Sequence, residues 1–167
     1  MVQISRCLTR TVATVEADIA TVTTQLTALD TAIEAFPLTG GSLLAALGIH
    51  SDATTLITTL NGATSDVTAN GALDDADGST ILASVEAIEP TILDALTDIV
   101  TKEPAFASLP IGGIPALILQ DLENLQTATA AFAAALVSNA PADLVSEAST
   151  LEDNINAAFT PAIAAYS

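Results

Sequence analysis

The chain has 167 residues, half of them hydrophobic but only 3% aromatic, and its formal net charge is −17. This length fits one domain with a substantial core, which aliphatic side chains must build because the chain has no tryptophan. With only three Lys and Arg residues, the surface cannot neutralise phosphates, so nucleic acids and anionic lipid headgroups are excluded as electrostatic partners.

The first predicted element is a long amphipathic helix over residues 8–36. Its apolar residues recur at steps of three and four, which is the spacing of one helix face. At a rise of about 1.5 Å per residue the helix is roughly 40 Å long, so it must lie along other helices. Cys7 is the only cysteine; a disulfide framework is therefore excluded, and we expect this thiol to be incidental.

The same spacing predicts a second and a third helix. Residues 42–47 are expected to form a short apolar turn that leads through Gly48 into the second helix, which ends near Asn70-Gly71. The third helix follows the acidic residues 74–77. Pro90 lies inside its apolar stripe, so we expect a kink there rather than an end.

Two further helices complete the chain. An apolar linker over residues 102–113 is expected to fold over one end of the molecule, and Pro115 occupies the first turn of the fourth helix. The fifth helix follows Asn139-Ala140-Pro141. Because the connections are short, the sequence predicts one all-α domain over residues 1–167, a single antiparallel bundle of about five helices.

We expect no transmembrane segment and no signal peptide. The most apolar stretch, residues 106–119, is interrupted by prolines and glycines, and a spanning helix needs roughly 20 apolar residues. Met1 is followed almost at once by the first helix, so the chain is read as a mature form whose localisation rests on resemblance alone.

Groups with catalytic or metal-binding potential are few. His50 is the only histidine, and adjacent Ser51 and Asp52 cannot converge on it as a catalytic triad requires. We expect Ser51 or Asp52 to cap the second helix and His50 to lie at the surface.

With Gly78 at the sixth position of a calcium loop, Leu73 would occupy the first position and Ser84 the twelfth, where acids are required. Zinc needs several His or Cys ligands. No metal is predicted.

Acidic pairs such as Glu86 with Glu89, or Glu147 with Glu152, have neither aromatic residues to bind a sugar nor cations to tune a pKa. We interpret them as solvated faces. The chain is therefore not expected to be an enzyme or to bind a cofactor.

Soft patterns of apolar spacing extend over nearly the full length, in residues 31–33, 54–57 and 73–77 and in the run 88–106, which holds Pro90, residues 96–100, Lys102 and Phe106. This layout resembles the fungal cell-wall galactomannoprotein family, which includes hydrophobic surface-binding protein A and antigenic mannoproteins that bind fatty acids. The resemblance implies a protein secreted or held in the cell wall, with a long-chain fatty acid or another apolar lipid between its helices.

The residues alone leave two states of the core open. The apolar stripes can pack to normal density, as in most bundles, or leave a tunnel that suits an acyl chain. With the resemblance added we expect a cavity, and Lys102 or, alternatively, Ser and Thr hydroxyls with water would hold the carboxylate. The predicted ligand-binding residues are Ile57, Leu60, Leu96, Val100, Lys102, Leu122, Phe132, Ile155 and Phe159.

Two other classes of protein remain as alternatives. A surface-active protein would open its bundle at an interface and adsorb to hydrophobic surfaces without a defined small ligand. In either case we expect a monomer or weak dimer. A helical inhibitor of secreted enzymes, resembling the plant invertase and pectin methylesterase inhibitors, would need paired cysteines. Cys7 alone argues against the inhibitor.

Overall fold

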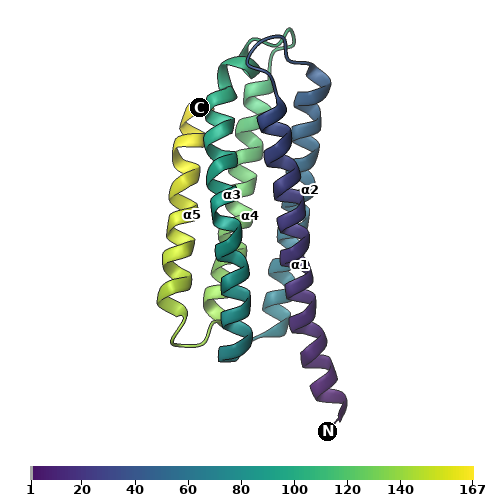
Figure 1. The fold of residues 1–167 in the computed structure, drawn as a ribbon, viewed down its shortest axis with the longest axis vertical. Helices are drawn as coiled ribbons and strands as arrows, with labels where there is room; N and C mark the ends of the chain where they lie inside the picture. Colours follow the sequence, from purple (N-terminus) through teal and green to yellow (C-terminus); the bar gives the residue numbers. More distant parts are fainter. Residues whose placement is uncertain (1) are drawn as a thin grey trace.

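Five long helices lie side by side and run alternately up and down the molecule (Figure 1). The computed structural model describes the backbone of residues 2–167 and the side chains of residues 12–167, so the prediction about Cys7 concerns a side chain outside the described residues. The predicted all-α antiparallel bundle is confirmed. Its elements are α1 (Val2–Ala35), α2 (Leu43–Asn70), α3 (Asp75–Ala107), α4 (Ile114–Asn139) and α5 (Val145–Tyr166).

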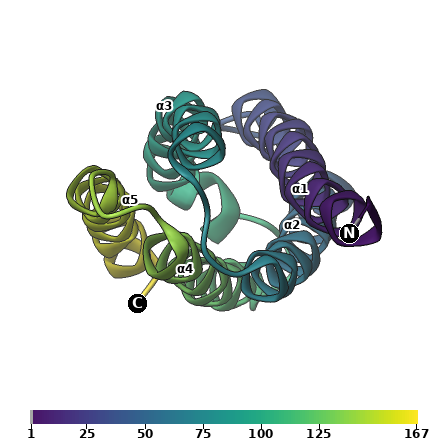
Figure 2. The same cartoon turned by 90° about the horizontal axis from the view of Figure 1, so that it is seen from below.

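Seen along the bundle axis, the helices form a closed ring (Figure 2). Around this ring α1 is followed by α2, α4, α5 and α3, and α3 packs against α1 again. The predicted stripe of the first helix faces inward, because Val15, Val22, Leu29 and Phe36 are all buried. Each helix thus contributes one apolar face to a shared core, as the repeated spacing requires.

The second helix begins earlier than predicted. The expected turn at residues 42–47 is the first part of α2, and the helix continues through Gly48. Ser42 is the N-cap residue, and its side chain accepts a hydrogen bond from the Ala45 amide at 3.1 Å, so the predicted caps at Ser51 and Asp52 are wrong. Burial of Ala46 and Ile49 offsets the roughly 1 kcal/mol that a glycine costs inside a helix.

The third helix also extends further than predicted. Asp74 caps it by accepting a hydrogen bond from the Asp77 amide at 2.8 Å, and the helix does not end at Pro90. It continues past Pro104, which shortens the predicted linker to residues 108–113. Phe106 is buried against Phe36 with their rings stacked at 4.2 Å, and this packing favours the extra turns.

The hydropathy of α2 is high enough to bear on the expectation that the chain has no transmembrane segment. Within the described part of the chain, α2 alone is long and apolar enough to cross a membrane, judged by length and composition only. In the bundle it packs against α1 and α4, and its inward face includes the buried residues Leu56 and Leu60.

Hydroxyl groups on the outer faces of the helices bond to their own backbone. Thr21, Thr54 and Thr97 each donate to the carbonyl four residues earlier, at 3.0, 2.9 and 2.8 Å. This local bond satisfies the hydroxyl donor without a partner from another helix, which allows so many threonines on a helical surface.

Candidate ligand cavity

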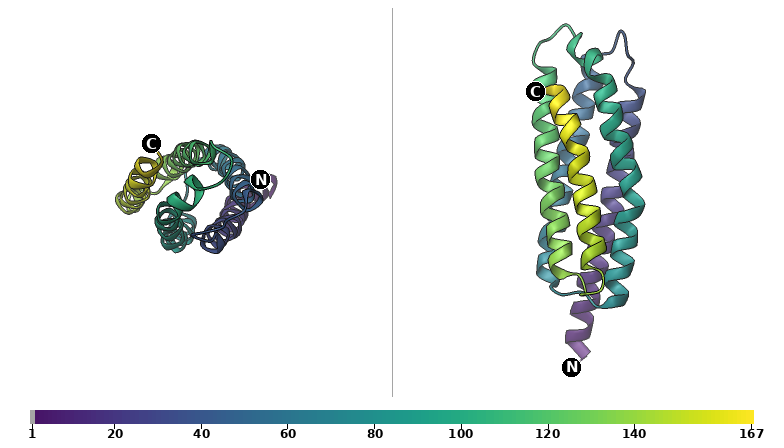
Figure 3. Two further views of the ribbon diagram at one scale, coloured as in Figure 1. Left: turned by 90° about the horizontal axis from the view of Figure 1, so that it is seen from above. Right: turned by 90° about the vertical axis from the view of Figure 1, so that its left-hand side faces the viewer.

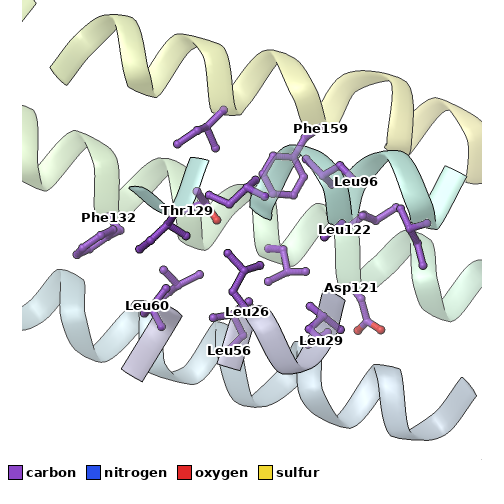
Figure 4. A pocket seen from close by; sticks show the side chains of 18 of the residues that line it. Leu26, Leu29, Leu56, Leu60, Leu96, Asp121, Leu122, Thr129, Phe132 and Phe159 are labelled. Atoms are coloured by element: carbon purple, nitrogen blue, oxygen red, sulfur yellow. The ribbon is translucent and has the colours of Figure 1, made fainter. Parts of the chain in front are cut away.

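An elongated apolar cavity of about 100 Å³ lies in the middle of the ring. All five helices contribute to its wall, for example through Leu26, Leu56, Leu96, Leu125 and Phe159 (Figure 4). Along α4 the wall extends from position 118 to position 136, a rise of about 27 Å. The cavity is therefore long, and nearly every side chain in its wall is a hydrocarbon.

The structure brings six of the nine predicted ligand residues together around this cavity, namely Leu60, Leu96, Leu122, Phe132, Ile155 and Phe159. Ile57 and Val100 do not line it and are partly buried against the surrounding core. One residue along a helix turns the side chain by about 100°, and the inward position on α2 is Leu56 instead of Ile57.

Lys102 lies outside the cavity wall. Its ammonium group donates hydrogen bonds to the carbonyl oxygens of Glu34, at 2.9 Å, and of Phe36. These carbonyls end α1, where a cation also interacts favourably with the helix dipole. Lys102 therefore caps the C-terminal end of α1. The hydroxyl residue that lines the cavity is Thr129.

A buried carboxylate is the polar feature that the sequence analysis missed. Asp121 is 7% exposed, the one buried charged residue among residues 12–167, and it lines the cavity. His50 reaches it from α2, with Nδ1 2.9 Å from each carboxylate oxygen. Burial raises the pKa of Asp121, and the hydrogen bond and charge of His50 partly oppose that rise.

His50 lies at the surface, as predicted, with 36% of its side chain exposed, but the prediction missed its partner. Its ring pairs with a buried residue 71 positions away in sequence. A signal for this site existed, because Asp121 interrupts the apolar stripe of α4 between Ile118 and Leu125. An acid at an inward position indicates a buried partner or a site.

A second cavity of about 40 Å³ adjoins the first between α3, α4 and α5. The two share Val85, Ala133, Leu136 and Ile155 as lining residues. The apolar space therefore continues toward the end of the bundle where α4 joins α5.

Carboxyl groups face one another where helices meet. The pKa of Asp18 in α1 is raised to about 6 by burial, by a hydrogen bond with Asp66 of α2 and by the charge of Asp66. Partial desolvation, a hydrogen bond with Glu147 of α5 and the charges of Glu147 and Glu89 raise the pKa of Glu86 in α3. Glu86 and Glu147 are exposed, as the predicted solvated faces require, and the raised pKa of Glu86 reflects the approach of acids from two helices.

One end of the bundle is formed by two segments without charged side chains, and the Lys102 ammonium contacts the first of them at the Phe36 carbonyl. Residues 35–49 and 104–120 contain no acidic or basic side chain, and the two loops that they include lie together at one end (Figure 3). We call this end the neutral tip. It displays four exposed apolar side chains, Leu38, Leu44, Leu47 and Ile111.

The opposite end is acidic. The α2–α3 connection enters α3 at Asp74, Asp75 and Asp77, and the α4–α5 connection holds Asp143. The charge of the molecule is therefore distributed unevenly along the bundle axis.

Comparison with known proteins finds similar structures that were solved with bound fatty acids. A profile of the family described as hydrophobic surface binding protein A matches residues 12–138. The chain is 31% identical to Afmp4p, whose crystal structure contains palmitic acid; the match covers 93% of this chain and 99% of that one, with a TM-score of 0.86.

Two more distant structures share the fold. Ligand binding domains 1 and 2 of the Penicillium marneffei MP1 protein, both complexed with arachidonic acids, are 17% and 16% identical to this chain. The matches cover 91% of this chain in both cases and 95% and 93% of the domains, with TM-scores of 0.82 and 0.81. No curated protein sequence matches the chain.

Proposed function

The chain belongs to the hydrophobic surface binding protein A family, and we propose that it is a secreted, non-enzymatic protein that encloses a long-chain fatty acid or similar apolar lipid. The observation that carries this proposal is the apolar cavity lined by all five helices. Its support is the 31% identity to Afmp4p, solved with palmitic acid. Secretion is proposed from the family alone, and its test is recovery of the chain from the culture medium of its source.

An acyl chain requires the cavity to widen. A cavity of about 150 Å³ holds a single benzene molecule, whereas this one measures about 100 Å³. Leucine and isoleucine side chains in the wall can change rotamer, and the adjoining cavity offers further space beyond Leu136. We therefore expect the bound chain to follow the long axis of the bundle and to push these side chains apart.

The test is native mass spectrometry of the purified protein, paired with analysis of an organic-solvent extract and with incubation in palmitic acid. A discrete added mass is expected. Leu122→Trp and Leu60→Trp place an indole in the cavity and should abolish uptake, while Ile57→Trp, outside the wall, should retain it. A protein that stays bare after incubation, or equal uptake by all variants that keep their helical circular dichroism, would contradict an enclosed site.

The neutral tip supports a second candidate function, adsorption to hydrophobic surfaces. Leu44 is 81% exposed and Ile111 is 53% exposed, on a molecule whose other surfaces carry the net charge of −17. Desolvating these side chains on an apolar surface gives about 25 cal/mol per Å² without burying a charge. Approach by the tip also keeps the acids of the opposite end in water.

A quartz microbalance coated with an alkyl layer tests this orientation. The variant with Leu44→Glu and Ile111→Glu should lose most of its adsorption, whereas Thr58→Glu with Thr127→Glu adds the same charge to exposed sides of α2 and α4 and should adsorb as before. Equal loss in both variants would indicate that the bundle adsorbs through its sides or opens at the surface.

A further inference from the structure

The cavity wall contains one carboxylate that the protein itself only partly satisfies. A buried carboxylate requires hydrogen bonds to offset its loss of water, and its two oxygens offer about four acceptor positions. Within residues 12–167, the donor that reaches Asp121 is Nδ1 of His50, 2.9 Å from both oxygens. When Asp121 is ionised it cannot donate, so Nδ1 carries the hydrogen, and acceptor capacity on Asp121 remains free.

Asp121 also lies at a position that suits a head group. It belongs to the second turn of α4, towards one end of the row of apolar side chains, and Phe132 lies at the other end (Figure 4). From position 121 to Leu136 the cavity wall follows α4 over a rise of about 22 Å. A lipid with its polar atom beside Asp121 would therefore run its chain along hydrocarbon only, with Thr129 as the one hydroxyl on the way.

We propose that Asp121, held in place by His50, is the head-group site of the cavity and selects long-chain lipids whose head group donates a hydrogen bond through O–H. This inference rests on the proposed function of lipid enclosure. The hydroxyl can belong to a long-chain alcohol or to a fatty acid that keeps its proton. An ionised head group would meet a second negative charge in a medium of low dielectric constant, and an ester would leave Asp121 without the donor. His50 acts as a positioning residue, since it fixes the carboxylate without lining the cavity.

Three probes of equal chain length separate these head groups: 1-hexadecanol, palmitate and methyl palmitate, each titrated into the full chain at pH 8. Hexadecanol is expected to bind at least about tenfold more tightly than the ester, because a site built for a hydroxyl leaves a buried acceptor unpaired with an analogue that lacks it. Palmitic acid labelled with ¹³C at its carboxyl group reports by its infrared band whether the bound acid keeps its proton, and thereby distinguishes the two sources of the hydroxyl.

Two substitutions at Asp121 make the test specific. Asp121→Leu removes the acceptor and should abolish the preference for hexadecanol over the ester. Asp121→Asn keeps a hydrogen-bonding group but removes the charge, so it should raise the affinity for ionised palmitate about tenfold. Glu123→Gln is the matched control, since this exposed acid on the same helix lies outside the cavity and its loss should change none of the three affinities.

The outcomes keep this inference distinct from the proposed function. If none of the probes binds the wild-type chain, lipid enclosure itself is wrong. If all three bind with equal affinity, or if Asp121→Leu retains the preference for hexadecanol, enclosure stands and the head-group site at Asp121 is refuted.

Discussion

The contact between Asp18 of α1 and Asp66 of α2 makes the stability of the bundle depend on pH in a direction unusual for acids. The pKa of Asp18 rises from 3.8 to about 6 on folding, first through burial and then through the hydrogen bond and charge of Asp66. The folded state therefore holds this proton more tightly than the unfolded state. The stabilisation is complete below pH 3.8 and is lost as the pH rises through about 6.

Asp66→Asn should remove the part of this loss that is due to Asp66, while the part due to burial remains. The whole shift of about two pKa units corresponds to about 3 kcal/mol. The remaining burial and the solvent screening of these partly exposed side chains reduce the expected effect to about 1 kcal/mol. The new amide can donate to Asp18 Oδ2, a buried oxygen that lacks a donor. At pH 7.5 the variant should therefore unfold about 3 °C higher than the wild type, and at pH 3.5 the two should coincide.

Thermal unfolding followed by circular dichroism at both pH values measures this difference. The matched control is Asp153→Asn, which removes one charge from an exposed position on α5 and corrects for the change in overall repulsion. The reasoning fails if Asp66→Asn lowers the unfolding temperature at pH 7.5, or if the control gains as much as the variant.

Two further substitutions test packing and the end of α1. A Cβ at Gly78 would lie 2.7 Å from Cδ of Pro141 in a rigid ring, so Gly78→Ala should destabilise the fold by about 1–3 kcal/mol in urea unfolding. Gly62 lies within α2, and a Cβ there would meet no neighbouring atom, so Gly62→Ala should instead stabilise the fold by about 0.5–1 kcal/mol. Equal effects of the two substitutions would contradict the close contact between Gly78 and Pro141. Lys102→Met should lower the free energy of unfolding by about 1 kcal/mol, because the Glu34 and Phe36 carbonyls lose their donor. Calorimetry should find the affinity for palmitic acid unchanged. A large loss of affinity would indicate that Lys102 belongs to the ligand site.

The helical bundle could be predicted because a single signal repeats in every segment. Apolar steps of three and four identify one buried face per helix, and Gly71, with φ 77°, ends α2 as the sequence indicated. The boundaries at Gly48 and Pro104 could not be predicted from local residues. There the burial of Ile49 and Phe106 outweighs the poor helix propensity of glycine and proline.

The cavity was predictable only in part. Six of the proposed ligand residues line it because they occupy inward positions of their stripes, whereas Ile57 lies one position from the inward Leu56. The pairing of His50 with Asp121 depends on how α2 and α4 face each other, and no pattern within either helix contains that information. Spacing along one helix defines a face, but the partner of that face is set by tertiary packing.

The hydroxyls that donate to carbonyls of their own helices also affect how water is oriented at the surface of this molecule. Thr21, Thr54 and Thr97 direct their hydrogens at backbone carbonyls, so only oxygen lone pairs remain for solvent. With 20 carboxylates and three basic residues in the chain, charged acceptors far outnumber charged donors. First-layer water beside these acceptors points its hydrogens inward. Two copies meet with hydration layers of the same orientation, which repel, and the neutral tip is where such layers are weakest.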